Sequence, residues 1–433
     1  MITKMKGTYD VIEDIGYMQE IEKKMMTVSR LFQYREIRTP HFEASSLFHR
    51  SVGETTDIVS KETYDFIDRG KRDNTLRPEG TAGVVRAFIE NKLYADKVQP
   101  QKYFYYGSMF RYERPQKGRF REFRQFGAEV FGSNDPLIDA EVIAYAVTFL
   151  KALKIKDVTV HLNTLGDQES KANYREALIN HLKGGVDGLC HDCQKRFHDN
   201  PLRILDCKVD QENPLLINAP HPIDYLIDED RAHFNNVLDA LKAMQINYEV
   251  DQRLVRGLDY YTHTVFEIKV SKDLLGNQNT ICGGGRYNNL VETLGGPVTP
   301  AVGFAFGIER LIVALKAANI TTPDAAMHVY FLTLGEAARL VATKLMQRFR
   351  IGGLMCNMDY LDKSMKAQFK QSDHQNARFV VIIGEQEVAE NTVNIKDQNT
   401  SESYTVSSGD AYHKIMELLL QGSGCEDCDK GAK

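Results

Sequence analysis

Phe110-Arg-Tyr-Glu-Arg-Pro-Gln-Lys-Gly-Arg-Phe-Arg-Glu-Phe-Arg-Gln125 is the stretch of this chain that decides its fold. Aromatic runs flank it on both sides, Lys-Tyr-Phe-Tyr-Tyr at 102–106 and Phe-Gly-Ala-Glu-Val-Phe at 126–131. Both runs have the composition of β-strands, whereas the residues between them are polar and lack helical periodicity. The sequence therefore predicts two antiparallel strands joined by a long charged loop.

The charged loop is a candidate binding surface for phosphate groups. Six basic residues fall between Arg111 and Arg124, and guanidinium groups bind phosphate oxygens in bidentate fashion. A solvated hairpin tip would explain an ordinary run of charge, but the aromatic strands and Gly118 at the turn favour a binding role. The net charge of the 433-residue chain is −5, so any surface for nucleic acid must be local.

The rest of the chain predicts a long α+β domain followed by a small α/β domain. Helices are expected at 17–33, 80–93, 137–154, 232–244 and 307–317, and strands at 34–40, 158–162, 260–270 and 301–306. Gly283-Gly-Gly285 predicts a tight turn with close backbone packing. From residue 328 strands and helices alternate, which predicts a largely parallel sheet. We expect domains at 1–325, with an insertion at about 168–225, and at 326–422, then a disordered tail at 423–433.

Three further segments carry groups suited to chemistry, although each is ambiguous alone. Glu79 stands between proline and glycine at a helix entrance, where a carboxylate also suits the helix dipole. Arg256 precedes the paired residues Tyr260 and Tyr261, and in isolation these would be a surface charge and two packing residues. Arg310 lies in the first turn of the helix expected at 307–317.

Taken together and in this order, the segments resemble the motifs of class II aminoacyl-tRNA synthetases. Residues 34–43 resemble motif 1, 110–129 motif 2 and 303–311 motif 3. Two stretches, 254–267 and 283–287, are particular to the histidyl family within that class. The C-terminal domain resembles the anticodon-binding domain of the same subclass, so the resemblance covers almost the full length.

This resemblance implies an antiparallel sheet flanked by helices, with an inserted domain and a C-terminal anticodon-binding domain. It implies a histidine–tRNA ligase that converts histidine and ATP into histidyl-adenylate and pyrophosphate, then esterifies the 3′ end of tRNA(His). The partners are then histidine, ATP with Mg²⁺, tRNA(His) and a second copy of the chain, which would form a homodimer through motif 1.

The resemblance also assigns roles to individual residues. It makes Arg111 and Arg256 the catalytic groups at the α-phosphate, with Glu113 and Arg310 as further ATP-binding residues. Histidine would be held by Glu79, Thr81, Gln125, Glu129, Tyr260 and Tyr261, and the tRNA acceptor end by Arg114, Gln116 and Arg121. Such a site works by alignment and charge stabilisation. Relatives often have Gln-Phe-His where this chain has Glu122-Phe-Arg124, which adds a charge beside the site.

The seven cysteines do not predict a disulfide framework, because no secretory signal is evident. Cys190-x-x-Cys193, with Cys207 nearby, has only partial zinc spacing, so we expect no protein-bound metal. No run of about 18 apolar residues is present, which predicts no membrane segment and a cytoplasmic location.

Three other interpretations are weighed against the ligase. The regulatory subunit of ATP phosphoribosyltransferase shares the class II fold, but it usually lacks the anticodon domain and several active-site residues. An amide ligase of the aspartyl type would not carry the 256–261 stretch. A plain RNA-binding module would not need the carboxylates Glu79 and Glu129 or the arginine Arg256.

Overall fold

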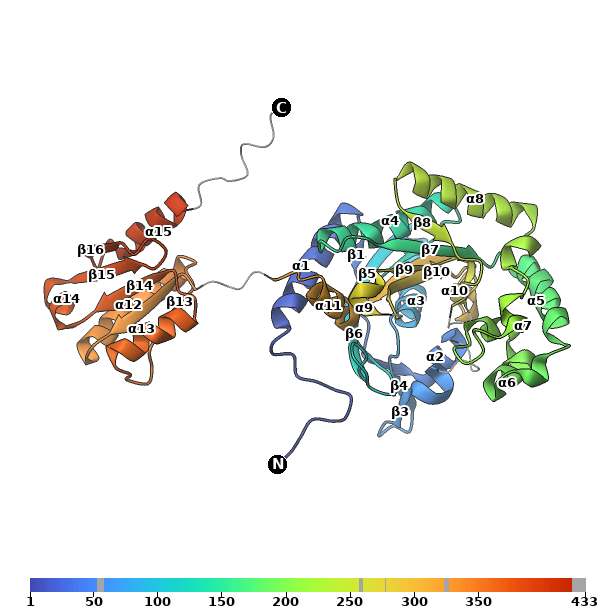
Figure 1. The fold of residues 1–433 in the computed structure, drawn as a ribbon, viewed down its shortest axis with the longest axis horizontal. Coiled ribbons are helices and arrows are strands. Elements are labelled where there is room, and N and C mark those ends of the chain that lie inside the picture. Colours follow the sequence, from blue (N-terminus) through green and yellow to red (C-terminus); the bar gives the residue numbers. More distant parts are fainter. Residues whose placement is uncertain (53–57, 257–259, 277, 323–326, 423–433) are drawn as a thin grey trace. The chain divides into compact units, whose positions relative to one another are not determined.

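The computed structural model describes residues 1–52, 58–256, 260–276, 278–322 and 327–422. The chain divides into two compact units, Met1–Thr322 and Pro323–Lys433, each with its own hydrophobic core (Figure 1). Gly257–Asp259, part of the stretch that resembles the histidyl family, and the tail at 423–433 lie outside the described residues.

An eight-stranded sheet forms the centre of the first unit, in the order β1-β5-β6-β11-β10-β9-β7-β8. Its strands are β1 (Arg35–Glu36), β5 (Gln101–Phe110), β6 (Glu122–Phe131), β7 (Thr159–Thr164), β8 (Tyr248–Val250), β9 (Thr262–Lys269), β10 (Thr280–Arg286) and β11 (Ala301–Gly307). The two outermost pairings are parallel, and the pairings between them are antiparallel. The predicted antiparallel hairpin at the charged loop is confirmed as β5–β6.

One face of this sheet is covered by helices. The helices that contribute to this core are α1 (Ile15–Leu31), α4 (Pro136–Ala152), α8 (Asp228–Ala243) and α11 (Ile308–Ala317). Alternate residues of β6, namely Phe126, Ala128 and Val130, are buried there, as strand geometry requires. Helix α4 begins where Pro136 follows Asp135, whose side chain accepts from the Leu137 N–H. The opposite face of β6 is therefore left for Gln125, Gly127 and Glu129.

That opposite face packs against α3 (Thr81–Glu90) and α10 (Leu290–Thr293), in a second buried cluster that includes Tyr105 and Tyr287. A small sheet follows beside it, in the order β2 (Phe42–Ala44), β4 (Asp73–Leu76), β3 (Tyr64–Ile67). Helix α2 (Ser45–Val52) directly follows β2.

The segment 168–225 folds into short helices around a small core of its own. They are α5 (Gln168–Leu182), η3 (Val186–Gly188), α6 (His191–Asp199), η4 (Pro201–Asp206), α7 (Pro214–Ile217) and η5 (Pro222–Tyr225). Most of these elements are shorter than the window over which helical periodicity can be recognised. This explains why the sequence showed no regular pattern here.

The second unit is a five-stranded sheet in the order β13-β12-β14-β15-β16. Its elements are β12 (Val329–Thr333), α12 (Glu336–Ile351), β13 (Cys356–Met358), α13 (Met365–His374), β14 (Phe379–Ile383), α14 (Glu385–Glu390), β15 (Thr392–Asp397), β16 (Ser403–Ser407) and α15 (Ala411–Gly422). β12 is parallel to β13 and β14, whereas β14, β15 and β16 are antiparallel. The expectation of a largely parallel sheet was therefore only half right, because the polar β15–β16 hairpin was not foreseen.

One local prediction in the first unit was wrong, and the strand predicted at 260–270 is present but begins two residues later. The glycines 283–285 lie inside strand β10 rather than in a tight turn. They are glycines because backbone and side-chain atoms of neighbouring segments occupy the space that a Cβ would take, so the predicted close packing is present. Tyr260 and Tyr261 precede β9, which begins at Thr262. Among the described residues, no helix has both the length and the apolar character needed to span a bilayer.

Candidate active site

Strand register places small residues in a row across the face of the sheet opposite the helical layer. Gly127 of β6 lies opposite both Tyr105 of β5 and Ala305 of β11. Ala305 lies opposite Gly283 of β10, which in turn lies opposite Glu267 of β9. Directly opposed residues project from the same face of a sheet. We call Gly127, Ala305 and Gly283 the small-residue row; no side chain larger than a methyl group stands between Tyr105 and Glu267 along it.

The neighbouring row holds a buried carboxylate. Glu129 of β6 is opposite Gly303 of β11, and a Cβ at Gly303 would overlap the Glu129 carboxylate. Thr81 Oγ1 donates to Glu129 Oε1 at 2.7 Å, and Tyr287 Oη donates to Glu129 Oε2. Glu129 is only 1% exposed, and glycine at 303 leaves free the space on this sheet that the Glu129 carboxyl group occupies.

The protonation of Glu129 is shifted by its surroundings. Burial raises the pKa of Glu129 to about 8, although hydrogen bonds from Tyr287 and Thr81 act in the opposite direction, and nearby Glu79 raises it further. Hydroxyl groups can either donate or accept. Glu129 can therefore keep its partners in both protonation states, which suits a group that exchanges a hydrogen bond with an incoming ligand.

Glu79 lies at the entrance of α3, where it caps the helix. Its carboxylate accepts from the backbone N–H groups of Thr81 at 2.7 Å and Ala82 at 2.8 Å, which the helix leaves unpaired. Burial raises the pKa of Glu79, while these backbone bonds lower it. The sequence-based interpretation as a helix-dipole partner is thus correct, and the same carboxylate lies close enough to Glu129 to influence its charge.

Four tyrosines gather around the two carboxylates. The Tyr260 ring centroid is 4.7 Å from that of Tyr261 and 5.5 Å from that of Tyr287. Tyr105 Oη is buried without a hydrogen-bond partner among the described residues. Burial raises the pKa of each of these phenols, so they stay neutral and can donate. Tyr105 and Tyr287 were missed as site residues; the alternation of Tyr105 with the inward-facing Phe104 was the available signal.

Arg256 is held directly over the small-residue row. Its guanidinium forms an ion pair with Glu267 and lies 5.9 Å from the centre of the Tyr261 ring, while a Cβ at Gly283 would overlap it. Thr280 Oγ1 donates to the second carboxylate oxygen of Glu267 at 2.9 Å. Glu267 therefore fixes Arg256 in place.

Arg310 is linked to the same network. Arg310 Nε donates to the backbone oxygen of Thr280 at 3.1 Å. The side chain borders a cavity of about 250 Å³ that is also lined by Lys117 and Gly118 of the charged loop. Arginine is thus placed where α11, β10 and the loop meet.

Arg111 and Glu113 lie where the charged loop leaves β5. Arg111 Nε donates to the Pro78 oxygen at 2.8 Å, and its charge acts on Glu79. Glu113 is 3.9 Å from Arg111 and 3.5 Å from Arg119. Arg111 therefore lies beside Glu79, at the end of the site where the charged loop begins.

The remaining predicted residues are spread along the loop and β6. Gln125 Oε1 is buried without a partner among the described residues. Arg114 and Gln116 are exposed, whereas Arg121 stacks on Tyr112 with its guanidinium 3.7 Å from the ring centre. Arg121 is thus packed more closely than the other two candidates for the tRNA end.

Arg124, the departure from the family pattern, is 3.5 Å from Glu309. Both oxygens of the Glu309 carboxylate also accept from the Arg124 backbone N–H at 3.0 Å. The extra charge beside the site is therefore paired within the protein.

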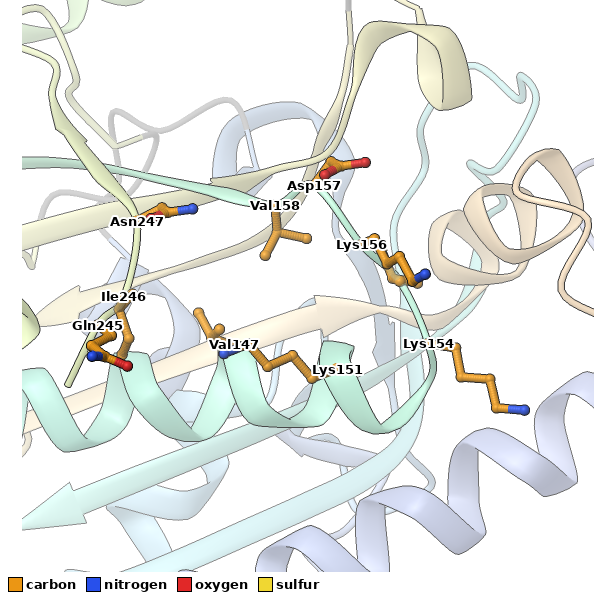
Figure 2. Close-up of a pocket in the computed structure, with 10 residues that line it drawn as sticks. Val147, Lys151, Lys154, Lys156, Asp157, Val158, Gln245, Ile246 and Asn247 are labelled. Carbon is orange, nitrogen blue, oxygen red and sulfur yellow. The ribbon is translucent and has the colours of Figure 1, made fainter. Parts of the chain in front are cut away.

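Two larger cavities are lined by neither Glu79 nor Glu129. Figure 2 shows one of about 440 Å³, lined by residues that include Val147, Lys151 and Asn247. None of the residues predicted for the site lines it. The other, of about 450 Å³, lies between Tyr9, Phe120 and Glu309.

An antiparallel sheet that carries arginines and buried carboxylates on one face, followed by a separate α/β unit, defines a class II aminoacyl-tRNA synthetase. The chain matches the family described as "Histidyl-tRNA synthetase" over residues 12–311 and the "Anticodon binding domain" over 328–418. The chain belongs to the histidyl-tRNA synthetase family.

Individual relatives agree with this assignment. The chain is 48% identical to "Histidine--tRNA ligase" of Bacillus subtilis and 50% identical to that of Bacillus velezensis, covering 96% of this chain and 99% and 97% of the relatives. The crystal structure of apo histidyl-tRNA synthetase from S. aureus superposes with a TM-score of 0.82 at 37% identity, covering 96% of this chain and all of that one.

Proposed function

We propose that this chain is a histidine–tRNA ligase, which activates L-histidine with ATP and transfers it to the 3′ end of tRNA(His). The observation that carries the proposal is Glu129, a buried carboxylate hydrogen-bonded to Thr81 and Tyr287, with the Arg256 guanidinium held over Gly283 of the same sheet. Its curated relatives bear the name histidine–tRNA ligase. The C-terminal unit and the retained arginines argue against the regulatory-subunit and plain RNA-binding alternatives.

Histidine is recognised through both nitrogens of its imidazole ring. Neutral imidazole has one N–H donor and one acceptor nitrogen; Glu129 accepts from the first and Tyr261 donates to the second. Glu79, Thr81, Gln125 and Tyr260 hold the ammonium and carboxylate end. An analogue that lacks either nitrogen leaves a buried polar group unpaired, and such sites reject analogues by about 10⁴-fold or more.

Adenylate formation proceeds by direct displacement. The carboxylate of histidine attacks the α-phosphorus of ATP, one P–O bond forms, the bond to the β-phosphate oxygen breaks and pyrophosphate leaves. Arg111 and Arg256 neutralise the charge that develops on the α-phosphate, while Glu113 and Arg310 position the nucleotide. Mg²⁺ bound to ATP would neutralise charge on the leaving pyrophosphate, and Arg256 would supply positive charge at the α-phosphate.

The two units divide the recognition of tRNA. Arg114, Gln116 and Arg121 on the charged loop contact the acceptor end beside the adenylate, and the unit at 326–422 binds the anticodon. Arg114 and Gln116 are exposed, which fits this role. We expect the enzyme to work in the cytoplasm, where charged tRNA is used.

We also propose a homodimer through the region that resembles motif 1. Phe42 of β2 is 54% exposed, and on β3 Phe66 and Ile67 are 40% and 69% exposed. The Phe42 and Phe66 rings pack edge to face at 5.9 Å, so they form one apolar patch. Patches of this kind on a folded chain mark protein–protein contacts.

ATP–pyrophosphate exchange, measured with each standard amino acid in turn, tests the proposed function. Exchange with histidine alone is the expected result, followed by charging of tRNA(His). Exchange with another amino acid, or none from folded protein, would contradict it.

A further inference from the structure

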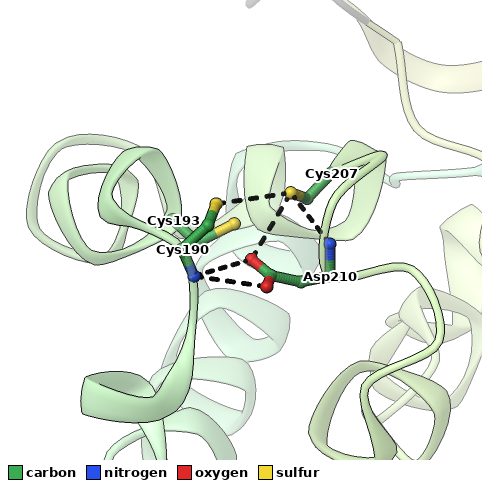
Figure 3. Close-up of side chains that lie close together, drawn as sticks. All are labelled: Cys190, Cys193, Cys207 and Asp210. Carbon is green, nitrogen blue, oxygen red and sulfur yellow. Dashed lines mark hydrogen bonds between the residues drawn. The ribbon is translucent and has the colours of Figure 1, made fainter.

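Four side chains of the segment 168–225 converge on one point (Figure 3). Cys190, Cys193, Cys207 and Asp210 place one sulfur or oxygen atom each so that all four lie within 4.8 Å of one another. Cys190 Sγ is 3.7 Å from Cys207 Sγ, and Cys207 Sγ is 3.4 Å from Asp210 Oδ2. The three cysteines are free thiols.

These separations are those of the edges of a metal tetrahedron. Zn–S bonds of about 2.3 Å at tetrahedral angles put two sulfur atoms about 3.8 Å apart, and a Zn–O bond of about 2.1 Å puts sulfur and oxygen about 3.6 Å apart. The observed 3.7 Å and 3.4 Å agree closely with both values. Because all four ligand atoms lie within 4.8 Å of one another, a divalent ion at the centre would require the longer separations to close by about 1 Å at most.

The spacing along the chain is that of two ligand pairs. Cys190-x-x-Cys193 is followed after 13 residues by Cys207-x-x-Asp210, a pattern typical of zinc sites except that aspartate stands at the fourth position. The Asp210 backbone N–H donates to Cys207 Sγ at 3.4 Å, and that of Cys193 donates to Cys190 Sγ. The sequence predicted no protein-bound metal, because the three cysteines, with His191 and His198 nearby, lack a clean pattern of paired ligands; the structure adds Asp210 as a fourth group at the same point.

We propose that Cys190, Cys193, Cys207 and Asp210 form a structural site for a thiolate-binding divalent cation, with zinc as its natural occupant. Four protein ligands leave no open position, which is typical of structural rather than catalytic zinc. The ion would join the start of α6 to the turn after η4. The segment's core is small and separate from the main one, and small cores gain most from such cross-links.

Two metal-free explanations compete with this proposal. Asp210 also accepts from the Cys190 backbone N–H at 3.0 and 3.2 Å, so it can serve simply as a cap for α6. Cys190 and Cys207 are also close enough to be oxidised to a disulfide. A cap explains neither the three thiols nor their common centre, and a disulfide between Cys190 and Cys207 leaves the third thiol, Cys193, unexplained.

Metal content of the full chain is the first test. Elemental analysis of reduced, purified protein should give one zinc per chain, unchanged in a Cys425→Ser/Cys428→Ser variant that removes the other Cys-x-x-Cys pair. Cys207→Ser should lose the ion. The proposal is overturned if the wild type takes up no zinc in competition with a colorimetric chelator, if the ion is lost with the tail cysteines, or if mass spectrometry shows a Cys190–Cys207 disulfide.

Substitutions at Asp210 separate a ligand from a cap without disturbing the buried cysteines. Asp210→Asn keeps an acceptor for the Cys190 N–H but is a poorer ligand, so zinc should be released to the chelator at least tenfold faster. Asp210→Cys completes a four-thiolate site and should release it more slowly. Co²⁺ added to stripped wild-type protein should show thiolate charge transfer and tetrahedral visible bands. Equal release from all three proteins, or octahedral cobalt, would overturn the assignment.

Discussion

Arg256 and Glu267 form an ion pair directly over Gly283. Glu267 takes one nitrogen of the guanidinium, while Arg256 Nε is buried without a partner among the described residues. Leaving such a donor unpaired is costly, so the group is available to a ligand. The pair therefore orients Arg256 and leaves part of its hydrogen-bonding capacity for the α-phosphate of ATP.

Replacing Arg256 with alanine should reduce ATP–pyrophosphate exchange with histidine by about 100-fold or more, since loss of one preorganised charge-stabilising donor has effects of this size. Arg256→Lys should recover little, because a point charge cannot reproduce the oriented guanidinium. Arg253→Ala, at an exposed arginine three positions away, is the matched control. If Arg256→Ala catalyses ATP–pyrophosphate exchange at the wild-type rate, Arg256 is not a catalytic residue.

Gly303→Ala should weaken histidine binding selectively. The added methyl group would overlap both the Glu129 carboxylate and the Ala128 backbone oxygen, so it would displace the carboxylate and also strain the strand pair, at a cost of about 1–3 kcal/mol. We expect the KM for histidine to rise at least tenfold and the KM for ATP to change little. Gly188→Ala, where a Cβ meets nothing within 4 Å, should match the wild type. Equal effects on both substrates would show that Gly303 does not serve the histidine site.

Glu129 should make the free energy of unfolding depend on pH. Its pKa is about 8 in the folded chain and 4.5 as the reference, so the folded state holds a proton that the unfolded chain releases between these values. Stability from this group is present at low pH and is lost as the pH rises towards 8, with a limiting slope of about 1.4 kcal/mol per pH unit.

The glutamine in Glu129→Gln cannot ionise. The free energy of unfolding of this variant, relative to that of the wild type, should therefore rise by about 2 kcal/mol between about pH 5.5 and 7.5. Urea denaturation at the two pH values measures this difference. Glu229→Gln, at an exposed carboxylate of α8, should show no such gain. Parallel pH curves for wild type and Glu129→Gln would show that Glu129 is already ionised in the folded protein.

The sequence predicted those parts of the structure whose signal is local. The β5–β6 hairpin was predicted from two aromatic runs on either side of a polar loop. The role of Glu79 at the start of a helix was predicted from the position of its carboxylate between proline and glycine. β10 was missed, because three consecutive glycines resemble a turn until the strands on both sides are known. The contacts of Glu129 could not be predicted either, since Tyr287 is 158 residues away along the chain. The small-residue row exists only through the register of three strands, β6, β11 and β10.

Removing residues 323–433 should spare histidine activation more than tRNA charging. The first unit has its own core and contains the carboxylates, tyrosines and arginines of the site, whereas the matched anticodon-binding region lies at 328–418. Exchange by the truncated chain should stay within about tenfold of wild type while charging falls by a further factor of about 100, equivalent to about 2.7 kcal/mol of lost tRNA binding. Equal losses in both assays would contradict this division of labour.

The exposed patch of Phe42 and Phe66 should hold two copies of the chain together. Light scattering should give twice the 49.2 kDa chain mass for the wild type. Phe66→Asp should give monomers, because a charge buried in an apolar contact is strongly unfavourable. Leu340→Asp, at a 69% exposed apolar residue of the second unit, controls for the general effect of the substitution and should remain dimeric. A monomeric wild type, or a dimer that survives Phe66→Asp, would place the interface elsewhere.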